Sequence, residues 1–136
     1  MRKQPQIFEF PKLGNRSNGY ISPAEKENLP FVVKRIYWTY FTPESIQRGG
    51  HAHYELEQIL IAAAGTIVVK TEMPNGFKKE FVLDSPDKAV FLPKMSWHIM
   101  LYSHDSVQMC IASLPYDEKD YIRNYDVFKN VEASNK

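Results

Sequence analysis

The chain has 136 residues, of which 43% are hydrophobic, 24% charged and 13% aromatic. This is the composition of one globular domain with its own core, and the aromatic content favours β structure. The 17 basic and 16 acidic residues leave a net charge of +1, which gives no support to nucleic-acid binding. The single cysteine, Cys110, excludes an internal disulfide and a zinc site built from cysteines.

The N-terminal segment begins with basic side chains but contains no apolar signal segment. No apolar run in the chain approaches the length of a membrane span. We therefore expect a cytoplasmic protein that does not engage a membrane.

The first thirty residues predict one short strand, a turn and a loop. The segment 7–10, IFEF, alternates apolar and polar side chains, and a glycine- and asparagine-rich stretch follows it. This strand could pair within the chain or with a second copy. Residues 22–30 are polar and contain two prolines, which predicts a loop that could include one helical turn.

Residues 31–114 predict a series of strands. The segment 31–41, FVVKRIYWTYF, is rich in β-branched and aromatic side chains, and its odd positions form the more polar face. The pair Asn75-Gly76 predicts a hairpin turn because both residue types accept a positive φ. We expect strands over 31–41, 50–63, 66–71, 77–83, 88–92, 95–102 and 107–114, with a loop over 43–50.

The pattern changes after Pro115. Asp117 is a suitable N-cap, and aromatic and aliphatic residues recur at helical spacing up to Phe128, which predicts an amphipathic helix over 117–128. We expect residues 131–136 to fray. About eight short strands with frequent turn signals and one terminal helix predict a single all-β domain over 1–136, a jelly-roll β-barrel with a short C-terminal helix.

The segment 48–65, RGGHAHYELEQILIAAAG, carries a dense set of polar candidates. On a regular strand the side chains of His51, His53 and Glu57 would share one face. The pattern H-x-H-x3-E with flanking glycines resembles the first motif of the cupin superfamily. The segment 93–98, PKMSWH, resembles the second cupin motif, with methionine where glycine is usual.

Two interpretations of these motifs stay open at this point. In metal-dependent cupins three histidines and a glutamate bind one divalent ion, so His51, His53, Glu57 and His98 form a candidate metal site. The alternative is that the histidine pair lies at a loop edge and has no chemistry.

The chain also resembles a narrower group. The segments KRIYWTY, RGGHAHYELEQ, WHIM and YDEKDYIRNYDVF together resemble the dTDP-4-keto-6-deoxyglucose 3,4-ketoisomerases, cupin enzymes of deoxyamino-sugar biosynthesis. The resemblance covers about residues 31–128; the Asp-Arg-Gly-like turn of the family is replaced here by residues 15–19, NRSNG. It implies a cupin jelly roll, a homodimer that exchanges N-terminal strands, a dTDP-linked 4-keto-6-deoxy sugar as substrate, and catalysis without a metal or cofactor.

The resemblance also implies roles for single residues. His51 and His53 would transfer protons at carbon and oxygen, since imidazole titrates near neutral pH. Tyr37 would hydrogen-bond the sugar oxygens or relay a proton. Arg35 and Arg48 are candidates for binding the diphosphate, because guanidinium groups bind phosphate bidentately. For Tyr37 and the arginines, a structural role is the competing interpretation.

The remaining candidates concern the second motif and the glutamate. Trp97 and His98 are adjacent, so only one of them can face the interior of a regular strand. We expect His98 inside and Trp97 at the rim, near the sugar or the base. Without a metal, Glu57 would orient a histidine or form part of the barrel floor.

The sequence therefore predicts an isomerase that moves the keto group of a nucleotide-linked sugar through an enediol. The rival interpretations are a metal-dependent cupin enzyme, the related 3,5-epimerase, and a sugar-nucleotide-binding cupin without catalytic activity.

Overall fold

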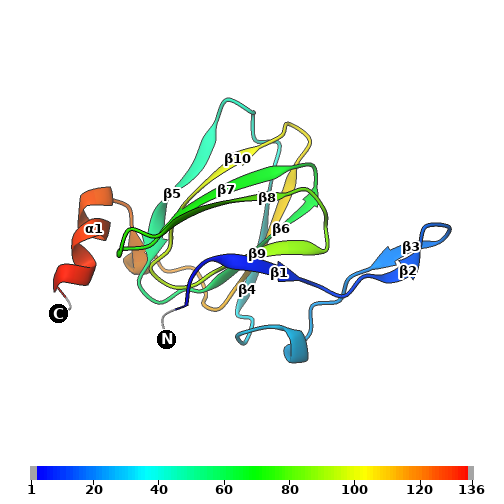
Figure 1. Ribbon diagram of the computed structural model, residues 1–136, viewed down its shortest axis with the longest axis horizontal. Helices are drawn as coiled ribbons and strands as arrows, with labels where there is room; N and C mark the ends of the chain where they lie inside the picture. Colours follow the sequence, from blue (N-terminus) through cyan, green and yellow to red (C-terminus); the bar gives the residue numbers. More distant parts are fainter. Residues whose placement is uncertain (1–2, 135–136) are drawn as a thin grey trace.

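Two five-stranded antiparallel sheets form the body of the computed structural model, which describes residues 3–134 (Figure 1). The first sheet has the order β1-β9-β6-β11-β4 and the second has the order β12-β5-β10-β7-β8. The first comprises β1 (Gln6–Glu9), β4 (Arg35–Tyr40), β6 (Gln58–Ala64), β9 (Lys88–Leu92) and β11 (Val107–Ala112). The second comprises β5 (Gln47–His53), β7 (Ile67–Glu72), β8 (Lys78–Leu83), β10 (Trp97–Tyr102) and β12 (Tyr121–Ile122). The expected all-β jelly roll is confirmed as a sandwich of two sheets rather than a closed barrel.

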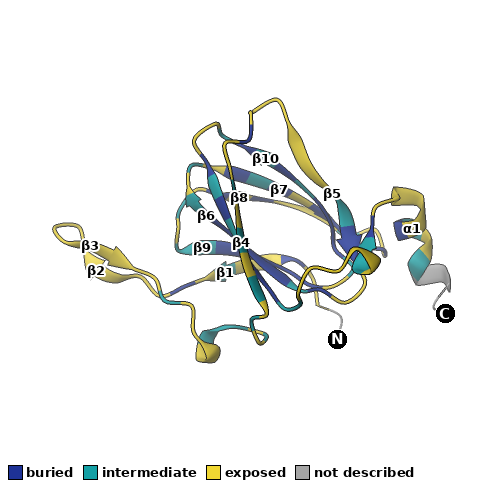
Figure 2. Ribbon diagram, turned by 180° about the vertical axis from the view of Figure 1, so that it is seen from behind, coloured by how far each residue is buried: buried dark blue, intermediate teal, exposed yellow. Residues whose placement is uncertain are grey.

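The main core lies between the inner faces of the two sheets (Figure 2). This core results from the alternation of inward and outward side chains along each strand. In β7, Ile67 and Val69 are fully buried, whereas the next residue, Lys70, is exposed. Burial of each such aliphatic side chain stabilises the folded state by about 1.5–3 kcal/mol relative to leaving it exposed. The strands predicted between residues 31 and 114 are all present, although β4 begins four residues later than expected and β5 begins within the expected loop.

The N-terminal region forms an arm in addition to a strand. The expected strand is β1, which pairs with β9 of its own chain. After it, β2 (Leu13–Asn15) and β3 (Gly19–Ile21) form a separate hairpin that projects from the body, and the 3-10 turn η1 (Lys26–Asn28) leads back towards β4 (Figure 1). All residues of both hairpin strands are exposed.

The C-terminal helix begins later than the spacing predicted. α1 covers Tyr125–Ser134, and residues 117–124 instead form the 3-10 turn η2 (Glu118–Asp120) and β12. The spacing fits a helix, but β12 finds backbone partners on the edge of β5, and this tertiary pairing overrides the local preference. Asn124 then caps α1 by accepting a hydrogen bond from the Val127 N–H at 3.0 Å. α1 includes part of the segment expected to fray, and residues 135–136 lie outside the described residues. No helix of the described chain is long and apolar enough to cross a membrane.

The predicted strand 50–63 is interrupted by a turn at residues 54–57, between β5 and β6. Just before this turn, the end of β5 is hydrogen-bonded to the second motif. The Met95 N–H donates to the carbonyl oxygen of His53 at 2.7 Å. Met95 has a φ of 68°, in the left-handed region that favours glycine. This geometry explains why glycine is usual at this position of the motif.

A β-bulge in β5 interrupts its pairing with β10. His51 lies opposite His98 and Gly49 lies opposite Ile99, so Gly50 is an extra residue on β5. Both glycines have positive φ, and a Cβ on Gly49 would lie 2.7 Å from the carbonyl oxygen of His98. The bulge reverses the alternation, so Arg48 and His51 face the same side of the sheet.

The two glycines give a matched test of this bulge. Replacing Gly50 with alanine introduces only the left-handed backbone cost, about 1–2 kcal/mol, because its Cβ position is open. Gly49→Ala adds the clash with β10, so we expect its unfolding free energy to fall by about a further 1–3 kcal/mol. Urea denaturation of both variants measures the difference. Equal losses would contradict the close approach of the two strands.

Candidate active site

A cavity of about 240 Å³ lies between the two sheets and receives side chains from both. Strand alternation carries Arg35, Tyr37 and Thr39 of β4 inward, as expected for its more polar face. The bulge carries Arg48 and His51 of β5 to the same cavity. The lining residues are Arg35, Tyr37, Thr39, Arg48, Gly49, His51, Leu60, His98, Met100, Tyr102, Gln108, Tyr116 and Tyr121.

Three histidines meet beside this cavity. One imidazole nitrogen from each of His51, His53 and His98 lies within 4.8 Å of the others. The ring of His51 lies 5.1 Å from that of His53 and 4.8 Å from that of His98, centroid to centroid. His51 and His98 line the cavity, whereas His53, only 3% exposed, is not among its lining residues. The expectation that His98 faces the interior is confirmed.

The tautomer of His98 follows from its hydrogen bond. Its Nδ1 lies 3.0 Å from the carbonyl oxygen of Ser96, and a carbonyl can only accept. Nδ1 therefore carries the proton and Nε2 carries the lone pair. Among the described residues, His51 Nδ1 and both nitrogens of His53 are buried and have no hydrogen-bond partner.

Burial keeps these imidazoles neutral. Burial first, and then the neighbouring His98, lower the pKa of His51 and of His53 to about 3 each. Burial also lowers the pKa of His98. At neutral pH all three rings are therefore uncharged and can accept a proton. The expectation that His51 and His53 titrate near neutral pH is wrong for the free protein, because burial lowers the pKa of both imidazoles.

Tyr37 is a protonated phenol in this environment. Burial, and then the nearby Cys110, raise its pKa far above the ordinary value of a tyrosine. Its hydroxyl oxygen accepts a hydrogen bond from Gln58 Nε2 at 3.2 Å. Burial likewise raises the pKa of the Cys110 thiol to about 12, so the thiol stays protonated at neutral pH.

Two guanidinium groups bring positive charge to the cavity. The guanidinium carbon of Arg35 lies 4.8 Å from the ring centroid of Tyr37, a cation–π contact. Its Nε is buried and has no hydrogen-bond partner in the described chain. Arg48 reaches the same cavity from β5. A buried donor without a partner is costly, so this end of the cavity is built for an acceptor.

Two sequence expectations about the site are wrong. Trp97 does not lie at the rim: it is 9% exposed and packs beneath α1 against Phe128, with ring centroids 5.4 Å apart. It points away from the cavity because its neighbour His98 points into it. Glu57 does not join the histidines, because the turn at 54–57 redirects it; its carboxylate lies 3.3 Å from Lys3 Nζ. The histidine cluster therefore lacks the glutamate of the cupin metal motif.

Sequence reasoning missed the contribution of the C-terminal segment. Tyr121 lies opposite His53 in the β12–β5 pairing, with ring centroids 4.3 Å apart, and it lines the cavity together with Tyr116. A carboxylate oxygen of Asp120 lies 3.5 Å from His53 Nδ1. The segment YDEKDYIRNYDVF carries part of the family resemblance, but the helical spacing over 117–128 gives no sign of these contacts.

The low pKa values of the histidines predict acid sensitivity. Each imidazole has a pKa near 6.5 in the unfolded chain and about 3 in the folded one for His51 and His53. Below pH 6.5 the unfolded state binds more protons, so stability is complete above that pH and is lost as the pH falls towards 3. The slope is up to about 1.4 kcal/mol per pH unit for each histidine.

Urea unfolding of the wild-type protein and of His53→Asn between pH 7.5 and 5 tests this effect. The stability of the wild type relative to the variant should decrease as the pH falls, because only the wild type must protonate this ring on unfolding. Parallel pH curves for the two proteins would contradict the neutral, buried state of His53.

The comparisons with known proteins agree on one family. The family model described as FdtA, "WxcM-like, C-terminal", matches residues 3–133. TDP-4-oxo-6-deoxy-alpha-D-glucose-3,4-oxoisomerase of Aneurinibacillus thermoaerophilus is 38% identical over 125 residues, which are 91% of this chain and 89% of the relative.

Solved structures give the same result over the whole fold. The sugar 3,4-ketoisomerase QdtA of Thermoanaerobacterium thermosaccharolyticum, in complex with TDP, is 31% identical with a TM-score of 0.89, covering 99% of this chain and 98% of that one. A variant of QdtA with one histidine replaced by asparagine, in complex with TDP-4-keto-6-deoxyglucose, is 30% identical with a TM-score of 0.89, covering 100% and 98%. By sequence and by fold, the chain belongs to the FdtA (WxcM-like, C-terminal) family.

Proposed function

We propose that this protein is an isomerase that converts TDP-4-keto-6-deoxyglucose to its 3-keto isomer. Of the relatives described above, one is named as an isomerase of this sugar nucleotide, and the others are ketoisomerases in complex with TDP or with TDP-4-keto-6-deoxyglucose. One observation on this chain carries the proposal furthest: a single cavity brings the neutral imidazole of His51 together with the guanidinium of Arg35, whose Nε is buried and has no partner in the described chain. A neutral base and a cation in one cavity suit a substrate with a weakly acidic C–H bond and a diphosphate.

The reaction is a proton shift between neighbouring carbons. The carbonyl at C4 acidifies the hydrogen at C3, and a base removes it while the oxygen at C4 gains a proton, which gives an enediol. The enediol then loses a proton from the oxygen at C3 and gains one at C4, so the ketone moves to C3. Each positioned proton-transfer group contributes about 10²–10⁴-fold in rate.

The two histidines differ in their access to the cavity, which supports different roles for them. We assign the transfer at carbon to His51, because it lies on the cavity wall. His53 lies behind it and serves as the second acid–base group. Tyr37, a protonated phenol in the same wall, donates a hydrogen bond to a sugar oxygen, and His98 contributes an Nε2 lone pair.

Arg35 and Arg48 are proposed to bind the diphosphate. The unpartnered Arg35 Nε supplies a buried donor, and the guanidinium plane matches phosphate oxygens. Trp97 is left out of the binding set, since its ring packs beneath α1. The configuration at C4 of the product depends on the face that receives the proton.

Two rival functions are separated by simple measurements. A metal-dependent enzyme would lose activity on exhaustive chelation and regain it with a divalent ion, whereas histidine acid–base catalysis would be unaffected. A binding protein without catalysis would leave the sugar unchanged. The cytoplasmic location stays a prediction.

His51→Asn tests the catalytic assignment. Asparagine has a similar shape but cannot take a proton, so we expect turnover of TDP-4-keto-6-deoxyglucose to fall by about 10²–10⁴-fold. Conversion is followed by NMR of the sugar, and the thermal transition checks that the fold is intact. His104→Asn is the control, because the His104 side chain is exposed and contacts Glu44, outside the site. Wild-type turnover in His51→Asn would refute the assignment.

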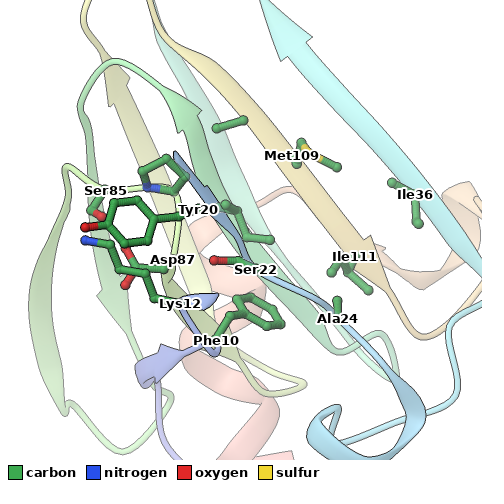
Figure 3. Close-up of a pocket in the computed structure, with 13 residues that line it drawn as sticks. Phe10, Lys12, Tyr20, Ser22, Ala24, Ile36, Ser85, Asp87, Met109 and Ile111 are labelled. Atoms are coloured by element: carbon green, nitrogen blue, oxygen red, sulfur yellow. The ribbon is translucent and has the colours of Figure 1, made fainter. Parts of the chain in front are cut away.

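We further propose that the protein is a homodimer formed over the outer face of the first sheet. Edge strand β4 exposes Ile36, Trp38 and Tyr40, and the N-terminal hairpin exposes Tyr20 and Ile21. A pocket of about 510 Å³ lies between the hairpin arm and this face (Figure 3). An isolated two-stranded hairpin is marginally stable in water, and an apolar edge strand is open to pairing, so a second copy is the partner that would cover both.

Trp38→Lys tests this dimer. A charge in the centre of the apolar face should shift the protein from dimer to monomer in sedimentation velocity at micromolar concentration. Val82→Lys is the matched control, since Val82 is also an exposed apolar residue on an edge strand, β8 of the second sheet. A monomeric wild-type protein, or a dimer unaffected by Trp38→Lys, would contradict this interface.

A further inference from the structure

We propose that Asp120 is a positioning residue that holds His53 in a single tautomer, with the proton on Nδ1 and the lone pair on Nε2. The inference deepens the proposed function, because it assigns to the C-terminal segment the task of orienting the second acid–base group. It concerns a residue that the sequence pattern placed in a helix and gave no role.

The two side chains face each other in a dry environment. Oδ2 of Asp120 lies 3.5 Å from His53 Nδ1, and the side chains are 12% and 4% exposed. Both nitrogens of His53 lack a hydrogen-bond partner within the described residues. Catalytic hydrogen bonds are often long in the free enzyme and shorten when substrate binds.

Backbone N–H groups of the turn at 54–57 hold the carboxylate of Asp120 in place. Its Oδ1 accepts from the Glu55 N–H at 2.9 Å and its Oδ2 from the Leu56 N–H at 3.1 Å. The main-chain carbonyl oxygen of Asp120 accepts from the Tyr54 N–H at 3.0 Å. The next residue, Tyr121, pairs with His53 itself. The turn that ends β5 therefore aims the carboxylate at the imidazole and prevents it from swinging away.

A carboxylate at this place selects one form of the ring. It can only accept, so the neutral imidazole presents its Nδ1 proton to Asp120 and keeps Nε2 free to take a proton. When Nε2 is protonated during turnover, the negative charge stabilises the imidazolium. His98 is oriented in the same sense by the carbonyl of Ser96. The two histidines thus have parallel tautomers, one set by a neutral acceptor and one by a charged acceptor.

The hydrogen bonds that Asp120 accepts also stabilise the turn at 54–57. Loss of activity alone would therefore not identify a positioning role. The test therefore needs a readout at the imidazole. Asp120→Asn keeps the shape and one acceptor but removes the charge. Asp117→Asn makes the same change at the start of the 3-10 turn η2 that contains Asp120, where the Asp117 carboxylate accepts from the Lys119 N–H. Leu56→Ala weakens the core at the turn and leaves the carboxylate in place.

The experiment measures the side-chain ¹⁵N shifts of His53 in ligand-free protein, together with kcat and KM. In the wild type and in Asp117→Asn we expect a protonated Nδ1 and an unprotonated Nε2. In Asp120→Asn we expect the tautomer to change or to become mixed, and kcat to fall by about 10²–10⁴-fold with KM changed by less than about threefold. Leu56→Ala should lower the thermal transition without altering the His53 shifts.

The proposal is overturned if Asp120→Asn leaves the His53 shifts or kcat unchanged, or if Leu56→Ala alters the shifts in the same way. The shifts are recorded without substrate, so this result stands apart from the proposed function. A wild-type protein that leaves TDP-4-keto-6-deoxyglucose unchanged, but shows the expected tautomer, would refute the isomerase activity and not the role of Asp120 in orienting the ring.

Discussion

The close approach of β5 to β10 at Gly49 is the constraint on which the site depends. The two strands meet where a side chain on residue 49 would clash with the carbonyl of His98, and Gly50 is inserted beside it. The insertion reverses the alternation of β5. Arg48, His51 and His98 consequently face one cavity, although Arg48 and His51 are three positions apart and would point to opposite faces of a regular strand. A cation and a base are thus placed together by two glycines.

Burial then sets the chemical state of each group. The histidines lose the solvation of their charged form and remain neutral, while the Nε of Arg35 is a buried donor without a partner in the described chain. In the described chain the cavity thus holds neutral imidazoles beside a guanidinium donor that has no acceptor, which costs free energy in the free protein. Under the proposed function, an anionic sugar nucleotide would supply acceptors for the arginines and an acidic C–H for the imidazole. Stability and activity therefore depend on pH through the same histidines.

The sequence predicted the fold and the inward face of β4 because strand alternation is a local property. Arg35 and Tyr37 were placed correctly for this reason. Alternation failed for Glu57, because a turn that it does not encode separates this residue from the histidines. The spacing of the C-terminal segment also fitted a helix, and only the free edge of β5 makes residues 121–122 a strand. Asp120 and Tyr121 reach the site through that long-range pairing, which no local pattern reports.

The central claim is that His51 and His53 move protons between two carbons of the bound sugar. The most direct measurement is NMR of the sugar after incubation of TDP-4-keto-6-deoxyglucose with the protein in D₂O. Proton transfer through an enediol predicts a 3-keto product that carries deuterium at C4. An unchanged sugar would contradict it, and so would a 3-keto product that His51→Asn forms at the wild-type rate.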